Sequence, residues 1–146
     1  MSFTYEYPRL MLTVDAVVFR QNGSRLEVLL IQRKHDPFAG MWALPGGFVD
    51  MDETVENAIV RELEEETSLK AVNLKQLYTF SSIGRDPRGR SVSVTFFGLT
   101  EMGNSAVKGG DDASDAQWFD IGSLPQLAFD HIKAVEKAVS KIDMLK

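Results

Sequence analysis

Three glutamates near the end of one predicted helix are the residues of this chain best placed to do chemistry. Glu62, Glu65 and Glu66 stand at positions i, i+3 and i+4, so a helix brings their carboxylates within about one turn. The apolar residues of the segment fall on one side of the helical wheel, and Glu62 and Glu66 lie in that same sector. Like charges beside a packed face repel one another and resist desolvation. The pattern therefore predicts a hard divalent cation, Mg²⁺ or Mn²⁺, with oxygen ligands.

The acidity of the chain is confined to this segment. The net charge of the 146 residues is −5, whereas residues 50–66 hold eight acidic residues and a single base, Arg61. This segment alone therefore carries −7 and the remainder +2, which suits an anionic ligand. The alternative interpretation is a solvated acidic helix face with a purely structural role, which would show no dependence on metal.

The element that positions these glutamates is the clearest helix of the sequence. Residues 54–67 contain no glycine or proline, and Asp50 or Asp52 is expected as the N-cap. A Pro-Gly-Gly bend at residues 45–47 precedes the helix. Strands interleaved with two helices predict an α/β fold in which a mixed central sheet carries a helix on each face. The expected strands cover residues 10–20, 25–33, 73–83, 91–100 and 116–120, a short extended piece covers 42–49, and the last helix covers 130–142.

The composition is that of one ordinary globular domain over residues 1–146. Apolar residues make up 44% of the chain and charged residues 25%. The lack of cysteine excludes disulfides, thiolate metal sites and a cysteine nucleophile. The N-terminal apolar run is broken by Thr13 and Asp15, is too short to span a bilayer and lacks a secretory cleavage site. We therefore expect a cytoplasmic protein that has no membrane partner.

The spacing around the acidic helix resembles the signature box of the Nudix hydrolases. Gly47 is followed by five residues, Glu53, seven residues and then the run RELEEETSL over 61–69. Every fixed position of the box agrees except Ser68, which stands where the family has glycine. Glycine there would end the helix in the left-handed conformation, so the serine predicts a strained or reshaped helix end rather than lost chemistry. Further segments resemble the ADP-ribose pyrophosphatase branch of the family, at residues 32–34, 42–47, 85–89, 110–119 and 127–131.

The resemblance implies a Nudix-type α/β/α sandwich that hydrolyses a nucleoside diphosphate linked to another moiety. The favoured reaction is the conversion of ADP-ribose and water to AMP and ribose 5-phosphate, with Mg²⁺ or Mn²⁺ as cofactor. The implied partner is a small nucleotide and not a nucleic acid, and the resemblance also makes a homodimer possible. Arg61 would pair with Glu53 and hold the helix against the loop. The metal would be bound by the carboxylates and one backbone carbonyl, so that the implied catalytic and metal residues are Gly46, Glu53, Arg61, Glu62, Glu65 and Glu66.

Candidates for substrate contacts lie outside the helix. Guanidinium groups match phosphate oxygens, so Arg33 and Arg85 are favoured, with Arg88 and Arg90 as weaker candidates. The general base is either a helix glutamate or an acid of a distal loop, and we include the loop's Asp111 and Asp112 in the substrate site. The remaining candidates are Asp115 as a base, Trp42, Phe48 and Phe80 as stacking or core residues, and His35 and His131 with no catalytic role assigned.

Two other functions remain open at this point. One is a pyrophosphatase that removes modified nucleoside triphosphates, and the other is a non-catalytic domain that senses an ADP-ribose-type ligand. The presence of all three box glutamates, without a basic helical extension after Lys146, favours catalysis.

Overall fold

The computed structural model describes residues 2–70, 72–110 and 113–146, so Asp111 and Asp112 lie outside the described part. Its elements follow in the order β1 (Met11–Asn22), β2 (Arg25–Arg33), β3 (Trp42–Ala43), β4 (Gly46–Phe48), α1 (Val55–Thr67), β5 (Lys75–Phe80), β6 (Ser91–Thr100), the short 3₁₀ helix η1 (Met102–Asn104), β7 (Ala113–Asp120), α2 (His131–Ser140) and the 3₁₀ helix η2 (Ile142–Leu145).

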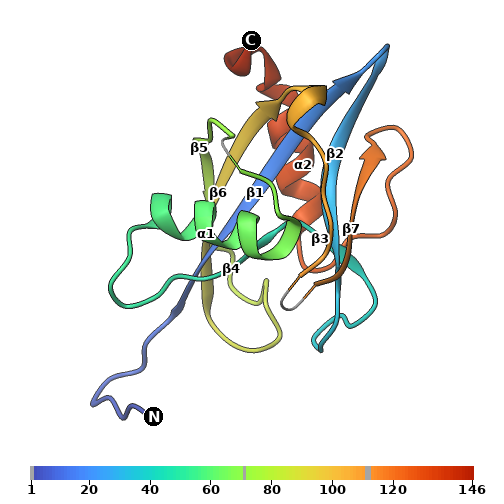
Figure 1. Ribbon diagram of the computed structural model, residues 1–146. Coiled ribbons are helices and arrows are strands. Elements are labelled where there is room, and N and C mark those ends of the chain that lie inside the picture. Colours follow the sequence, from blue (N-terminus) through green and yellow to red (C-terminus); the bar gives the residue numbers. More distant parts are fainter. Residues whose placement is uncertain (1, 71, 111–112) are drawn as a thin grey trace.

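The described strands form one mixed sheet around β1 (Figure 1). Strand β1 runs parallel to β6 along its length and antiparallel to β2 and β4 on its other edge. Strand β2 in turn pairs with β3 and β7, and β5 pairs with β6. The predicted α/β fold with a mixed central sheet is confirmed.

The two helices cover opposite faces of this sheet (Figure 1). Successive side chains of a strand point to opposite faces, so β1 contributes to two cores. Val14 packs in a cluster that includes Ile59 of α1, whereas Val17 packs in a cluster that includes Val135 of α2. The order helix, sheet, helix is therefore the predicted α/β/α sandwich, and none of the described helices is long and apolar enough to cross a membrane.

The N-cap of α1 is Thr54, so the prediction of Asp50 or Asp52 is wrong. The Thr54 hydroxyl accepts a hydrogen bond from the Asn57 backbone N–H at 3.1 Å, which satisfies one of the free donors of the first turn. Both aspartates precede the cap in the chain. The Asp50 backbone N–H instead donates to Glu53 at 2.9 Å, so the turn before the helix is tied to the box glutamate.

Several strands begin or end at other residues than predicted, because pairing between distant segments sets their limits. The extended piece at 42–49 divides into β3, which pairs with β2, and β4, which pairs with β1. Between them, the Pro45 carbonyl accepts the Ala16 N–H at 2.9 Å. Strand β7 begins at Ala113 rather than at residue 116, since its first residues pair with the end of β2 across a register shift. Strand β5 is shorter than the predicted 73–83.

Candidate active site

A cleft of about 340 Å³ lies where β1, β4 and β6 meet the two helices. One wall holds the loop after β5 and the start of α2, and the opposite wall holds the inner side of α1. The polar and charged residues that line it are Thr13, Asp15, Arg33, His35, Asp36, Asp50, Glu62, Glu66, Arg85, Asp86, Arg88, Ser93 and His131. The site therefore draws on segments from almost the whole length of the chain.

The box glutamates divide between the cleft and its rim. Glu62 and Glu66 line the cleft, whereas Glu65 does not and its side chain is 40% exposed. Glu66 is buried, and its Oε1 accepts the Gly46 backbone N–H at 2.7 Å. A Cβ added to Gly47 would lie 2.6 Å from Glu62 Oε1, so a larger residue there would displace this carboxylate from its place against β4. The Gly-Gly pair thus brings the strand directly against the acidic side of α1.

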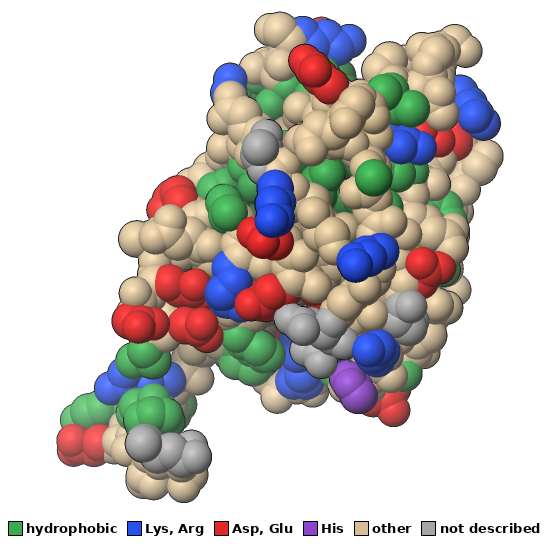
Figure 2. Space-filling model, viewed as in Figure 1, with side chains coloured by type: hydrophobic (Ala, Val, Ile, Leu, Met, Phe, Trp, Pro, Cys, Tyr) green, Lys and Arg blue, Asp and Glu red, His purple; other side chains and the backbone are tan. Residues whose placement is uncertain are grey.

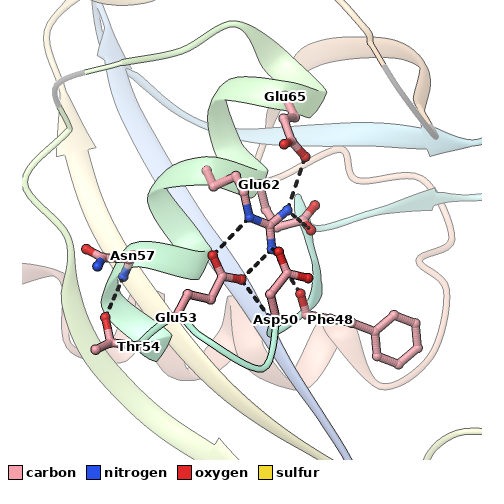
Figure 3. A network of polar contacts seen from close by, with 8 residues as sticks. Phe48, Asp50, Glu53, Thr54, Asn57, Glu62 and Glu65 are labelled. Carbon is pink, nitrogen blue, oxygen red and sulfur yellow. Dashed lines mark hydrogen bonds and ion pairs between the residues drawn. The ribbon is translucent and has the colours of Figure 1, made fainter. Parts of the chain in front are cut away.

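Arg61 links the helix to the loop that precedes it, and Figure 3 shows its partners Glu53, Glu62 and Glu65. Its guanidinium reaches Glu53 Oε1 at 2.5 Å, Glu62 Oε1 at 2.8 Å and Glu65 Oε2 at 3.2 Å. It also donates to the Phe48 carbonyl at 3.1 Å, and hence to β4. The pairing of Arg61 with Glu53 that the resemblance implied is present, together with three more carboxylates, those of Glu62, Glu65 and, at 3.7 Å, Asp50.

This network sets the charge state of its members. The hydrogen bond from Arg61, helped by one from the Asp50 backbone N–H, lowers the pKa of Glu53 to about 2. The same pairing with Glu53, and a further bond to Glu62, raises the pKa of Arg61 above its ordinary value. In Figure 2, acidic side chains lie close to a basic one on the surface over α1. Glu53 and Arg61 are therefore both charged at neutral pH.

Arg61 supplies part of the positive charge that the clustered glutamates need, in addition to the predicted cation. The glutamates do not stand bare, because Glu62 and Glu65 both contact the guanidinium. Within residues 2–70, 72–110 and 113–146, no group of three or more acidic or histidine side chains is arranged to hold a metal ion. The donor chemistry still suits a hard cation, since carboxylate oxygens of Glu62 and Glu66 face the cleft beside the Gly46 backbone.

Three of the four candidate arginines lie at the cleft, each held by a different partner. Arg85 is nearly buried and forms a bidentate pair with Asp130 at 2.8 and 3.0 Å. Arg33 donates to the Pro37 carbonyl at 2.8 Å and lies over the Phe129 ring. Arg88 lies over the same ring at 5.5 Å and is described next. The fourth, Arg90, is absent from the cleft lining and donates to the backbone of Ser91.

Arg88 and Asp86 form a preorganised pair at the cleft mouth. The Arg88 guanidinium donates to both carboxylate oxygens of Asp86, at 2.8 and 3.1 Å, and lies 5.0 Å from the Phe48 ring centre. Burial alone would raise the pKa of Asp86, but the hydrogen bonds from the Arg88 side chain and backbone outweigh burial and lower it. Asp86 therefore stays charged and fixes the arginine in place.

The remaining candidates separate into cleft and core. Phe48 lines the cleft, while Trp42 and Phe80 pack in the core on the α2 side. The Asp115 carboxylate does not line the cleft and accepts from the Ala116 N–H and the Gln117 amide. The loop before Asp111 and Asp112 does reach α1, because a Cβ on Gly110 would lie 2.5 Å from the Glu65 carbonyl.

Sequence reasoning missed Asp15 and His131 as cleft residues. Both are buried, at 7% and 6% exposure, and they approach each other at 3.6 Å. No catalytic role was assigned to His131, whose Nδ1 accepts the Leu44 backbone N–H at 3.0 Å. The available signal was a charged residue in an otherwise apolar strand, since Asp15 lies between Val14 and Ala16.

Ser68 takes the backbone conformation that the family glycine would take. Its φ of 66° and ψ of 4° are left-handed, and its N–H donates to the Glu64 carbonyl at 2.9 Å, which ends α1. The helix end is thus strained and not reshaped, and the side chain of Ser68 lies outside the cleft lining.

Comparison with known proteins agrees with the architecture. The sequence matches the NUDIX domain family over residues 9–138. It is 46% identical to the ADP-ribose pyrophosphatase of Methanocaldococcus jannaschii over 84% of this chain and 69% of that protein. It is 32% identical to the ADPR responsive transcriptional repressor NtrR of Acinetobacter baylyi over 94% of this chain, but the chain spans only 56% of the repressor.

A solved structure shows the same fold with a ligand. The NUDIX domain of Shewanella oneidensis NrtR, crystallised with ADP ribose, superposes with a TM-score of 0.86 at 37% identity, covering 93% of this chain and 90% of that domain. The match of the family over residues 9–138, together with the Arg61 network on the cleft, leads to one conclusion. This chain belongs to the NUDIX domain family and is a Nudix hydrolase.

Proposed function

We propose that this protein hydrolyses ADP-ribose to AMP and ribose 5-phosphate with the help of Mg²⁺ or Mn²⁺. The observation that carries the proposal is the composition of the cleft, in which carboxylates of α1 and guanidinium groups of other segments face the same space. A diphosphate has to be neutralised before water can attack it, and such a cleft offers oxygen donors for a cation and fixed positive charges for phosphoryl oxygens. The similarity to the archaeal pyrophosphatase supports the same substrate class.

The proposed metal residues are those of the acidic helix and the strand against it. Glu62 and Glu66 would hold the cation together with the Gly46 carbonyl, and Glu65 would join them from the rim. When bound, a divalent cation neutralises phosphoryl oxygens and lowers the pKa of a coordinated water. Arg61 keeps Glu53 ionised and ties α1 to the loop, so its role in the proposal is to position the carboxylates.

The substrate side of the proposal rests on the arginines. Arg33 and Arg88 both present guanidinium groups over the Phe129 ring, and Arg88 keeps its pairing with Asp86 in that position. Arg85 is nearly buried against Asp130, so its contribution would be to shape the wall of the cleft. Asp111 and Asp112 remain proposed substrate contacts, and a homodimer remains a proposal from the resemblance.

A substrate screen with matched variants tests this function. Purified protein is assayed with ADP-ribose and with a panel of nucleoside triphosphates, in Mg²⁺, in Mn²⁺ and after chelation. Glu66→Gln should lose at least about 100-fold in kcat/KM, because it weakens a metal ligand. Glu64→Gln is the matched control, since Glu64 is exposed, pairs with Lys70 at 3.4 Å and does not line the cleft, and it should retain the wild-type rate.

The panel also separates the rival functions. Preference for a triphosphate would identify a nucleotide-pool pyrophosphatase with the same box. Tight binding of ADP-ribose without turnover in either metal would identify a ligand-sensing domain, the function named for the NtrR relative. Full activity of Glu66→Gln would show that the helix carboxylates do not carry the reaction.

A further inference from the structure

On the face of the sheet that α2 covers, the side chains of β1 and β6 change from apolar to polar at the same level of both strands. Alternate residues of β1 share a face, and β1 is in parallel register with β6, so that Asp15 lies opposite Thr95 and Val17 opposite Phe97. On one side of this level Val17, Phe19 and Phe97 pack in the core with α2. On the other side lies a polar floor made of Thr13, Asp15, Ser93 and Thr95, of which the first three line the cleft.

Asp15 is the charged member of this polar floor, and it lines the cleft. The residue is 7% exposed. Among the residues that the structure describes, none donates a hydrogen bond to this carboxylate, and His131 Nε2 lies 3.6 Å from Asp15 Oδ1. The carboxylate therefore keeps acceptor positions that a ligand in the cleft can use.

His131 supplies a hydrogen-bond donor beside this carboxylate. Because its Nδ1 accepts the Leu44 N–H, the neutral ring carries its proton on Nε2, which is the nitrogen closer to Asp15. Burial lowers the pKa of His131, although the negative charge of Asp15 opposes that shift, so the ring is neutral at physiological pH. The cleft thus offers an acceptor and a donor side by side.

The hydroxyl groups of the polar floor can also both donate and accept hydrogen bonds. Thr13 and Ser93 hydrogen-bond to each other through their side chains. The Thr95 hydroxyl is buried and has no hydrogen-bond partner among the described residues. Three hydroxyls, a carboxylate and an imidazole N–H are therefore gathered on one patch, next to the Gly46 and Glu66 contact.

The chemistry of this patch selects one kind of ligand group. A phosphate only accepts hydrogen bonds and would be repelled by Asp15, while an ammonium only donates and would leave the imidazole N–H unused. A vicinal diol both donates and accepts, and a carboxylate can take both of its protons in a bidentate contact. Asp15 Oδ1 lies 2.6 Å from the position of a Cβ on Gly46, so the diol would sit close to the proposed diphosphate position.

We propose that Asp15 and His131 form a diol-binding site that holds a ribose ring directly attached to the diphosphate of the substrate. This inference deepens the proposed function and rests on it. Both riboses of ADP-ribose are attached to the diphosphate, so the experiment distinguishes the adenosine ribose from the terminal one. Asp15 is then a specificity-determining residue for sugar hydroxyls, and His131 orients it.

Three substrates and one pair of variants test the diol site. The substrates are ADP-ribose, ADP esterified with tetrahydrofurfuryl alcohol, whose terminal ring has no hydroxyls, and ADP-ribose built on 2′,3′-dideoxyadenosine. For the wild type, kcat/KM should fall about 10- to 100-fold with one of the two analogues, which identifies the ribose concerned. Asp15→Asn should lose a similar factor with ADP-ribose and far less with that analogue. Asp143→Asn, an exposed aspartate of η2, is the control and should match the wild type.

Each result decides the question. Wild-type rates that agree within about threefold for all three substrates overturn the proposal, as does an equal loss for all three in Asp15→Asn. If Asp15→Asn fails to fold, the wild-type comparison alone decides. If no substrate is hydrolysed in either metal, the proposed function fails. Calorimetric titration of the same three ligands then tests the diol site by itself. Equal Kd values for the three ligands reject the site, and weaker binding of one analogue supports it.

Discussion

Replacement of Ser68 by glycine should stabilise the protein without changing its catalysis. Ser68 ends α1 at φ 66°, where a residue with a Cβ costs about 1 to 2 kcal/mol relative to glycine. Glycine also makes the unfolded chain more flexible, which returns about 0.4 to 1 kcal/mol. The net gain in unfolding free energy is therefore about 0.5 to 1 kcal/mol, or a rise of about 2 to 3 °C in Tm for a domain of this size.

The assay compares thermal unfolding of the wild type with two serine variants. Ser82→Gly is the matched control, because Ser82 is exposed and is not among the described residues with positive φ, so glycine there adds only unfolded-state entropy and should lower Tm slightly. Opposite signs for the two variants would support the strain at Ser68. A Ser68→Gly protein that melts at or below Ser82→Gly would refute it. A large gain in kcat would show instead that serine had damaged the chemistry.

Three shorter predictions concern residues of the same region. Gly47→Ala should reduce kcat/KM by at least about tenfold, because its Cβ would lie 2.6 Å from Glu62, whereas Gly103→Ala has free space and should be neutral in the same assay. Because the pKa of Glu53 is lower in the folded than in the unfolded protein, its ionised carboxylate stabilises the fold above about pH 4.5, and this stabilisation is lost as the pH falls to about 2. The unfolding free energy of Glu53→Gln, measured with denaturant, should therefore depend less on pH in this range. Since burial lowers the pKa of His131, stability should also fall below about pH 6.5, by up to about 1.4 kcal/mol per pH unit, and His131→Asn should lack this slope.

The sequence was most informative where the chemistry depends on a single helix. The spacing of Glu62, Glu65 and Glu66 fixes their angular positions on α1, so the prediction that Glu62 and Glu66 lie inward needed nothing beyond helix geometry. The left-handed backbone of Ser68 also followed from its place in the box. The N-cap was harder to predict, because several polar residues precede the helix and the sequence alone does not show which of them meets the free N–H groups of the first turn; in the structure it is Thr54.

Features that depend on register between distant segments could not be predicted. The contact of Leu44 with His131 joins residues 87 apart in sequence, and it exists only because α2 begins beside β3. Asp15 reaches the cleft because β1 pairs with both β4 and β6 at that level. Similarly, a side chain as long as Arg61 has many rotamers, and the pattern alone could not show that it contacts three glutamates at once.

The four glutamates between residues 62 and 66 show how one turn of helix produces four environments. Glu64 points to solvent beside Lys70, while Glu65 lies at the rim on Arg61. Glu62 contacts both Arg61 and the cleft, and Glu66 is buried with its Oε1 on the Gly46 N–H. Because Arg61 fixes the outer carboxylates and the β4 backbone fixes the inner one, little side-chain freedom is left to lose on binding. The acidic helix is therefore preorganised by the chain itself, with Gly47 leaving space for the Glu62 carboxylate and Arg61 holding it from the other side.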